Sequence, residues 1–266
     1  MGKKHGRPGR PNRPQDRHRG RDHGRIRGDG PVLLYGWHTV RAALENSNRR
    51  IRRLYATENA ARRLADAGVR LETPPEIVRP EAIASRLSPD AVHQGLLAEA
   101  DPLPAPELSE IQGDLVLLLD QITDPHNVGA IVRSAAAFGV AAIVTTARHS
   151  PDATGVLAKS ASGGLEYVPI VLVQNLARAL AELKERGFML VGLDEQAEAD
   201  LADAPLRAPL ALVLGAEGKG LRQLTLATCD LGARLVLPGA IKSLNVSNAA
   251  AVALQIATAR IRTREE

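Results

Sequence analysis

Three segments of the chain gather side chains that can align a polar ligand by hydrogen bonding. Asn127 lies in the first, residues 120–133, and Glu217 stands among glycines in the second, residues 214–221. The third, residues 243–248, contains only Ser, Leu, Asn and Val. Amides, hydroxyls and an isolated carboxylate form directed hydrogen bonds, so the three segments are candidates for a binding or catalytic site.

The third segment lies between an expected strand at 234–237 and an Ala-rich helix that we expect over 245–262. The first backbone N–H groups of a helix have no partner within the helix, and Ser or Asn side chains commonly satisfy them. The same side chains could instead present hydrogen bonds to a ligand. From this segment alone, helix capping and ligand binding both remain open.

The first segment leads into an expected helix over 128–138, with Asn127 at the position of its N-cap. Arg133 follows less than two turns later, next to Ile131 and Val132. Either Arg133 extends to solvent, or it is buried and needs an anionic or polar partner. Glu217 is either a surface charge or that partner.

The glycines of the second segment allow its backbone to approach a ligand closely. The segment lacks the Gly-Lys-Ser/Thr ending of a phosphate-binding P-loop and the Gly-x-Gly-x-x-Gly spacing of a dinucleotide fingerprint. A nucleotide-cofactor oxidoreductase is therefore disfavoured.

Residues 114–266 alternate aliphatic runs with helical stretches, which predicts an α/β domain with a mostly parallel sheet and helices on both faces. Ligands bind such sheets at the carboxyl ends of the strands, where the three segments lie. The expected strands are 115–120, 142–146, 168–173, 188–194, 210–215 and 234–237, and the expected helices are 128–138, 176–186 and 245–262.

Before that region we expect a smaller α/β domain at 31–100 and a Pro-rich linker at 101–113. The small domain should contain strands at 32–36, 51–55, 69–72 and 95–98 and helices at 37–44 and 59–67. Residues 1–30 hold ten Lys or Arg against three Asp or Glu, a net +7, whereas the remainder of the chain sums to −3. This tail is expected to be disordered, and its charge suits either a polyanion such as RNA or a purely solubilising role.

Composition limits the class of protein. One cysteine permits no intrachain disulfide and makes a thiolate metal cluster implausible, which favours a reducing cytoplasmic location. No apolar run approaches the roughly 18 residues needed to cross a bilayer. The spacing of His38, His93 and His126 matches no metal site, so neither a membrane nor a metal is expected.

Taken in order, the three segments resemble the motifs of the SpoU/TrmH branch of the SPOUT superfamily, which are RNA ribose 2′-O-methyltransferases. The matching residues are Asn127-x-Gly129-x-x-x-Arg133, Leu214-Gly215-x-Glu217-x-x-Gly220, and Leu237-Pro238 through Ser243-Leu244-Asn245-Val246-Ser247. Residues 31–100 resemble the substrate-binding module of the branch that methylates guanosine in large-subunit (23S) rRNA.

The resemblance implies a trefoil-knotted sheet, a homodimer and S-adenosylmethionine bound in the knot. It implies RNA as substrate, with rRNA preferred, in isolation or within a pre-ribosomal particle. A tRNA ribose methyltransferase remains an alternative, as does a catalytically inactive RNA-binding factor on the ribosome.

Residue by residue, the resemblance implies cofactor contacts at Gly215, Leu237 and Leu244. It implies catalytic roles for the polar residues Asn127, Arg133, Glu217, Ser243 and Asn245. A guanidinium keeps its proton at ordinary pH, since its pKa exceeds about 12, so Arg133 is a poor base. Our hypothesis is that Arg133, held by Glu217, stabilises negative charge developing on the ribose 2′-oxygen.

Overall fold

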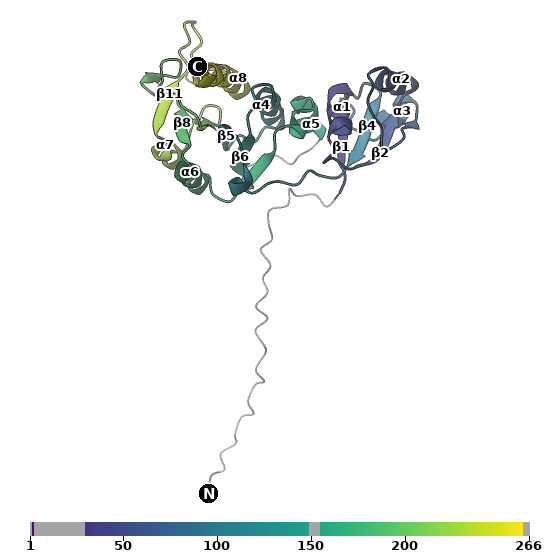
Figure 1. Cartoon of the computed structure of the whole chain (residues 1–266), viewed down its shortest axis with the longest axis horizontal. Coiled ribbons are helices and arrows are strands. Elements are labelled where there is room, and N and C mark those ends of the chain that lie inside the picture. The colour runs from purple at the N-terminus through teal and green to yellow at the C-terminus, as the bar shows by residue number, and fades with distance from the viewer. Residues whose placement is uncertain (1, 3–29, 149–154, 263–266) are drawn as a thin grey trace.

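The computed structural model describes Gly2, residues 30–148 and residues 155–262. The basic tail at 1–30 therefore lies almost entirely outside the described residues. Two sheets form two lobes side by side (Figure 1), one built before residue 101 and the other after residue 114.

The first lobe contains a four-stranded sheet in the order β1-β4-β2-β3. Strand β4 is antiparallel to both β1 and β2. Helices α1 and α2 pack Val40 and Leu64 against one face, and α3 packs Ile83 against the other. Its elements are β1 (Val32–Tyr35), α1 (Trp37–Glu45), β2 (Ile51–Ala56), α2 (Glu58–Asp66), β3 (Glu76–Ile77), α3 (Pro80–Ala84) and β4 (Leu96–Ala100).

The second lobe contains a seven-stranded sheet, β7-β6-β5-β10-β8-β11-β9, in which every recorded strand pair is parallel. This confirms the expected mostly parallel α/β sheet. Its strands are β5 (Leu115–Asp120), β6 (Ala142–Thr146), β7 (Ile170–Val173), β8 (Met189–Leu193), β9 (Ala199–Asp200), β10 (Leu210–Gly215) and β11 (Leu231–Arg234). Its helices are α4 (Pro125–Ala137), α5 (Gly155–Ala161), α6 (Leu176–Glu185), α7 (Gln223–Thr228) and α8 (Val246–Arg262), with 3₁₀ turns η1 (Leu108–Glu110) and η2 (Gly164–Glu166).

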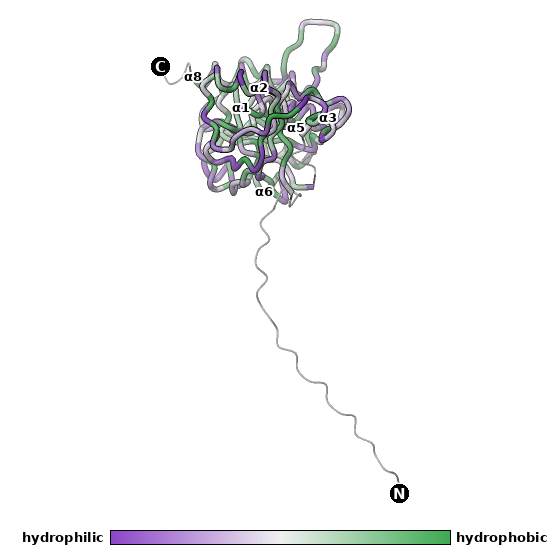
Figure 2. The backbone as a smooth tube through the Cα atoms, turned by 90° about the vertical axis from the view of Figure 1, so that its right-hand side faces the viewer, coloured by the Kyte–Doolittle hydropathy of each residue, from purple (hydrophilic) through white to green (hydrophobic). Residues whose placement is uncertain are grey.

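Helices cover both faces of this sheet because its central strands are aliphatic throughout. Leu117 and Leu119 of β5 face the cluster that includes α4 and α8, whereas the alternating Val116 and Leu118 face α6. Period-two alternation sends successive side chains to opposite faces, so an all-aliphatic strand must be covered twice. Figure 2 colours the backbone by hydropathy and shows hydrophobic segments running through the body of the molecule.

Two predicted strands were wrong. Residues 69–72 are not a strand, because Val69 turns inward after α2 and the edge strand is β3 instead. The strand predicted at 234–237 lies three residues earlier, as β11, whose pairing with β9 ends at Arg234. The aliphatic residues that follow have left the sheet in a loop that projects from the body of the molecule (Figures 1 and 2).

No helix within the described residues is both long and apolar enough to cross a membrane.

Candidate active site

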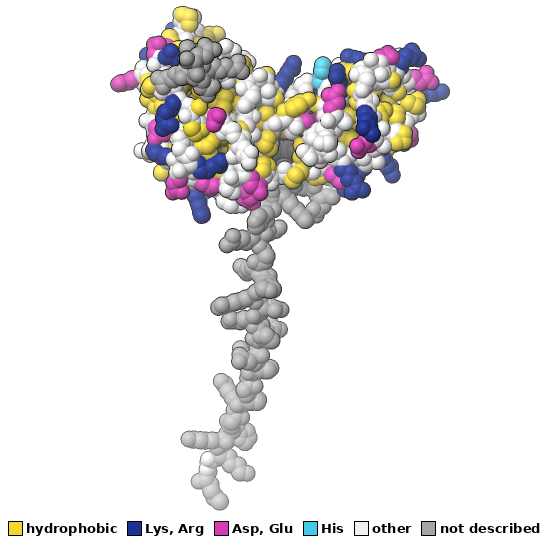
Figure 3. Space-filling model, in the orientation of Figure 1, with side chains coloured by type: hydrophobic (Ala, Val, Ile, Leu, Met, Phe, Trp, Pro, Cys, Tyr) yellow, Lys and Arg dark blue, Asp and Glu magenta, His cyan; other side chains and the backbone are white. Residues whose placement is uncertain are grey.

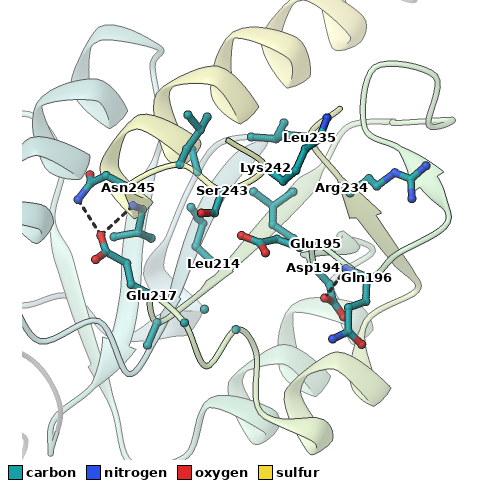
Figure 4. Close-up of a pocket in the computed structure, with 18 of the residues that line it drawn as sticks. Asp194, Glu195, Gln196, Leu214, Glu217, Arg234, Leu235, Lys242, Ser243 and Asn245 are labelled. Carbon is teal, nitrogen blue, oxygen red and sulfur yellow. Dashed lines mark hydrogen bonds between the residues drawn. The ribbon is translucent and has the colours of Figure 1, made fainter. Parts of the chain in front are cut away.

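A hydrogen-bond network joins all three polar segments, and Glu217 is its centre. Glu217 Oε1 accepts from Asn245 Nδ2 at 2.7 Å, from the backbone N of Val246 at 3.1 Å and from Asn127 Nδ2 at 3.3 Å. Asn245 Nδ2 also donates to Asn127 Oδ1 at 3.0 Å. Figure 4 shows the Glu217 and Asn245 side chains turned toward each other. The structure therefore brings three of the five predicted catalytic residues into direct contact.

Asn127 belongs to the first turn of α4 and is not its N-cap. Asp124 takes that position, accepting from the backbone N of His126 at 3.0 Å, and Pro125 occupies the first helical position. Proline suits the first helical position, because a backbone N–H there would have no hydrogen-bond partner within the helix and proline lacks that N–H. Since Asp124 caps the helix, the Asn127 amide is available to the network.

Asn245 has both of the roles left open by the sequence. Its Oδ1 caps α8, accepting from the backbone N of Ser247 at 3.0 Å and from the Ser247 hydroxyl at 2.6 Å, while its amide nitrogen joins the network. The Glu217 carboxylate supports the same helix end through Val246. A negative charge is favourable there because the helix N-terminus carries partial positive charge.

Glycines shape the loop that carries Glu217. A side chain at Gly215 would overlap the backbone of Gly220 and Leu221, so the loop folds back tightly directly after β10. Gly218 and Gly220 adopt positive φ values of 72° and 60°, a backbone conformation that residues other than glycine rarely adopt. The Gly-rich pattern therefore serves a sharp turn that holds Glu217 at the rim of the sheet.

Asp120 anchors the far end of this loop. Its carboxylate is 1% exposed and accepts from Arg222 Nε at 2.7 Å and from the Arg222 backbone N at 3.2 Å. Asp120 was missed as a site residue in the sequence, although an acidic residue ending the aliphatic strand 115–120 was the available signal. A buried carboxylate requires partners, and here they fix the loop over the end of β5.

A cavity of about 520 Å³ lies beside the network at the carboxyl ends of β8, β10 and β11. Such a volume accommodates a nucleotide-sized ligand. Ser243, Leu244 and Leu237 line it, as does Gly215, so it contains every predicted cofactor contact. Lys242 Nζ donates to the backbone O of Leu237 at 3.0 Å, closing the loop that forms one wall.

Asp194 and Glu195, in the loop after β8, line the same cavity and were not anticipated from the sequence (Figure 4). Lys219 and Lys242 also contribute to the lining. Groups of both charges suit a ligand with both charges, such as an amino acid sulfonium. The cavity therefore fits S-adenosylmethionine in size and charge, with apolar leucine side chains available for its base.

Arg133 departs from the expected arrangement. Its side chain is exposed, and within the described residues no hydrogen bond or ion pair joins it to Glu217. Ile131 and Val132 are fully buried on the inner side of α4, whereas position 133 falls on the outer side of the same helix. Of the two alternatives left open by the sequence, Arg133 extends to solvent, and the hypothesis that Glu217 holds it was wrong.

The part of the chain that the structure describes contains no group of three or more His, Cys, Asp or Glu residues able to hold a metal ion.

Comparison with known proteins decides the family. Residues 114–255 match the SpoU rRNA Methylase family, and residues 33–106 match a second family described as RNA 2′-O ribose methyltransferase substrate binding. The chain belongs to the SpoU rRNA methylase family. The network and the cavity both lie within the residues matched to that family.

Two curated members of the family are similar over most of their length. The 23S rRNA (guanosine-2′-O-)-methyltransferase RlmB of Ralstonia nicotianae is 42% identical over 236 residues, covering 84% of this chain and 93% of that protein. The RlmB of Pseudomonas putida is 37% identical over 239 residues, covering 83% of this chain and 93% of that protein.

Among solved structures, the SpoU methyltransferase AviRb from Streptomyces viridochromogenes, in complex with AdoMet, is similar across both lobes. The TM-score is 0.73 at 26% identity, and the match covers 89% of this chain and 91% of that one. AviRb is thus similar to this chain across both lobes.

Proposed function

We propose that this chain transfers the methyl group of S-adenosylmethionine to the ribose 2′-oxygen of a guanosine in 23S rRNA. The observation that carries the proposal is the Asn127–Glu217–Asn245 network at the rim of the cavity, in a chain of the SpoU rRNA methylase family. The curated relatives named for this activity are similar to the chain across both lobes.

The cofactor would be held by the cavity. Gly215 and Gly220 form its tight floor, Leu237 and Leu244 supply apolar surface, and Ser243 lies between the cavity and the network. S-adenosylmethionine supplies an electrophilic methyl group on a positively charged sulfur. No metal is required, because the sulfonium is itself an effective leaving group.

The network's part in the proposed mechanism is orientation. The Glu217 carboxylate fixes the amides of Asn127 and Asn245, so each presents its remaining hydrogen-bonding capacity in one direction. Amides held in this way align a ribose hydroxyl without reorganising during the reaction. Glu217 retains Oε2 as a further acceptor for a substrate proton.

Arg133 keeps a proposed role that its exposure makes possible. An exposed guanidinium on α4 is accessible to an RNA phosphate or to the developing 2′-oxyanion. In this role Arg133 supplies a positive charge to the RNA without being held by Glu217. The Arg133 side chain does not line the cavity, so it should contribute to RNA and transition-state binding without contacting the cofactor.

The two lobes would divide the work, with 31–100 binding RNA, 101–113 linking and 114–266 catalysing. Exposed arginines on the first lobe support RNA binding there, because guanidinium pairs well with phosphate. They are Arg50, Arg52, Arg53, Arg62, Arg63, Arg70, Arg79 and Arg86. The basic tail at 1–30 would add sequence-independent attraction.

Two further properties are proposed from the family resemblance: a trefoil knot around the cofactor, and a homodimer. Large apolar side chains exposed on α8 and on the loop before it are the surface that a homodimer would cover. They are Val236 at 55%, Ile241 at 77%, Leu244 at 36% and Val252 at 41% exposure.

The test is to incubate the protein with methyl-labelled S-adenosylmethionine and separate pools of rRNA and tRNA. Label in 23S rRNA supports the proposal, and label in tRNA alone would establish the competing tRNA ribose methyltransferase. Calorimetry distinguishes the inactive-factor alternative, since a protein that binds RNA but not S-adenosylmethionine has no donor to use. Comparing naked rRNA with pre-ribosomal particles identifies the preferred form.

A further inference from the structure

One ion pair, Arg49–Glu166, is buried on both sides. The two side chains are only 4% and 2% exposed, whereas every other recorded ion pair of the described residues has at least one partner more than a quarter exposed. Arg49 Nη2 and Nε donate to Glu166 Oε1 at 2.7 and 3.2 Å, and Nε also lies 3.1 Å from Oε2. The pair is thus a forked contact of fixed direction.

Asn46 and Asp101, which both precede the second lobe in the chain, complete the pair. Asn46 Nδ2 donates to Glu166 Oε2 at 2.8 Å, and Arg49 Nη1 donates to the backbone O of Asp101 at 2.8 Å. Asn46 and Arg49 follow α1, Asp101 follows β4, and Glu166 lies in η2 of the second lobe. We call these four residues the sheet-to-sheet clamp.

The segment that carries Glu166 contacts both lobes. On the first-lobe side, Thr39 Oγ1 of α1 donates to the backbone O of Ala158 at 3.3 Å, and Gly163 has no room for a side chain beside α1. Burial in this junction also lowers the pKa of Lys159.

On its other side, the segment packs directly on the catalytic helix. A side chain at Gly129 of α4 would come within 2.7 Å of the backbone O of Leu157, and one at Gly164 within 3.0 Å of the backbone O of Val132. Gly129 lies two residues after Asn127. The α5–η2 segment therefore forms a short, close-packed path from the first lobe to the helix that carries Asn127.

Packing between the lobes is incomplete beside the clamp. Arg49 and Glu166 line a cavity of about 370 Å³ between the lobes, together with the prolines that follow Asp101. Figure 3 shows the hollow that separates the two lobes on the outer surface. Where packing is incomplete, a directional ion pair is what can select one relative orientation.

We propose that the sheet-to-sheet clamp sets the orientation of the first lobe relative to the Asn127–Glu217–Asn245 network, which makes Arg49 and Glu166 positioning residues for RNA. The inference rests on the proposed function, in which RNA bound by the first lobe reacts at that network. RNA that contacts both lobes at once gains affinity only where their relative orientation lets it reach both, so one fixed orientation favours productive RNA binding.

The first variants are Glu166→Gln, which keeps the shape of the side chain but removes its charge, and Arg49→Lys, which keeps the charge but loses the planar fork. For each, KM and kcat are measured with transcribed 23S rRNA, the S-adenosylmethionine Kd by calorimetry, and the lobe separation by X-ray scattering of the full chain. We expect kcat/KM for RNA to fall about 10- to 100-fold, mainly through KM, with a changed scattering profile. The cofactor Kd should stay within twofold, because the clamp does not line the cofactor cavity.

The double variant Arg49→Met/Glu166→Leu separates positioning from stability. Replacing a buried pair by apolar residues of similar volume is often neutral or stabilising, so its Tm should equal or exceed that of the wild type. Its RNA KM should nevertheless remain raised, because apolar side chains form no directional hydrogen bonds that could fix the orientation of the lobes. Recovery of RNA KM together with Tm would overturn the proposal.

Arg41→Ala provides the matched control, because it breaks an exposed Arg–Glu pair on α1, the helix adjacent to the clamp. Exposed pairs contribute little, so its kinetics and scattering should match the wild type. Unchanged RNA KM and scattering in Glu166→Gln would contradict the clamp. Failure of the wild type to methylate rRNA would instead contradict the proposed function, while the scattering comparison still tests the clamp.

Discussion

At the scale of single residues, Glu217 connects structure and chemistry. Its carboxylate holds two amides from other segments and supports the N-terminus of α8 with one oxygen. The helix end and the two amides stabilise an anion in this position. Loss of its charge should therefore affect catalysis more than it affects the fold.

Glu217→Gln retains the shape of the side chain and removes its charge. We expect kcat to fall about 100-fold or more, the loss typical of one preorganised electrostatic group, because the amides then donate to a neutral oxygen and Oε2 is replaced by an NH2 donor. Calorimetry should give an S-adenosylmethionine Kd within a few-fold of the wild type. A variant with normal turnover would remove Glu217 from the mechanism.

Arg133→Lys tests the exposed guanidinium on α4. Lysine keeps the charge but loses the planar fork, so methyl transfer to RNA should slow about 10-fold or more while cofactor binding is unchanged. Arg178→Lys on α6 is the control, since that exposed arginine lies on the opposite face of the sheet. Equal rates for Arg133→Lys and the wild type would show that only charge matters there.

Cys229 gives a residue-scale prediction based on pKa. Burial, followed by the nearby Asp230 carboxylate, raises the pKa of the Cys229 thiol from 9.0 to about 12. A raised thiol pKa lowers the thiolate fraction at pH 8, by about 10³-fold for a shift of three units. Alkylation by iodoacetamide at pH 8 should therefore be slow in the folded protein and fast after denaturation. Fast alkylation without denaturant would contradict this burial.

Sequence patterns predicted the members of the network better than their arrangement. Asn127, Glu217 and Asn245 lie in polar loops that follow predicted strands, and the family resemblance assigned them to the reacting end of the site. The predicted pairing of Arg133 with Glu217 does not form, because position 133 lies on the outer side of α4, away from the buried Ile131 and Val132. The start of that helix was also misplaced. Asp124 and Pro125 start it three residues earlier than expected.

At the scale of elements, the cofactor cavity depends on how two loops leave neighbouring strands. Residues 216–222 close over β10 and are anchored to Asp120, while residues 235–245 leave the sheet after β11. The central strands were predictable, because a strand buried on both faces appears in the sequence as a nearly continuous aliphatic run. The end of β11 was not predictable, because the residues that follow it, 235–237, are as aliphatic as a strand.

Gly215→Ala tests the closed loop. The added methyl group would overlap the backbone of Gly220 and Leu221, so the loop must open and the cavity floor must move. We expect S-adenosylmethionine affinity to fall at least about 10-fold, with about 1–3 kcal/mol lost from the free energy of unfolding. Calorimetry and thermal unfolding measure the two effects.

Gly232→Ala in β11 is the matched control for that variant. Its added methyl group meets only ordinary contacts at 3.6 Å, so cofactor affinity should be retained. Equal S-adenosylmethionine affinity in the two variants would contradict the claim that the turn at Gly215 forms the floor of the cofactor cavity.

At the scale of the whole molecule, the proposed dimer would cover the apolar side chains of α8. Val252→Glu places a charge on that exposed face without touching the core. We expect light scattering to give a dimer for the wild type and a monomer for Val252→Glu, because burying an unpaired charge in an interface is unfavourable. A wild-type monomer at micromolar concentration would rule out the dimer.

Removal of residues 1–30 tests the basic tail. Each phosphate contact releases counterions, so losing a segment of net charge +7 should weaken RNA binding and flatten its salt dependence. Cofactor affinity should not change. An unchanged salt slope would mean that the tail makes no direct electrostatic contact with RNA.

The most direct test is nucleoside analysis of 23S rRNA after reaction with labelled S-adenosylmethionine. The rRNA is digested to nucleosides, and the position of the label is compared for the wild type and Glu217→Gln. The wild type should place it in 2′-O-methylguanosine, and Glu217→Gln should reduce it about 100-fold or more. Label on a base, on a ribose other than that of guanosine, or in equal amounts in both proteins would contradict the proposed reaction at this site.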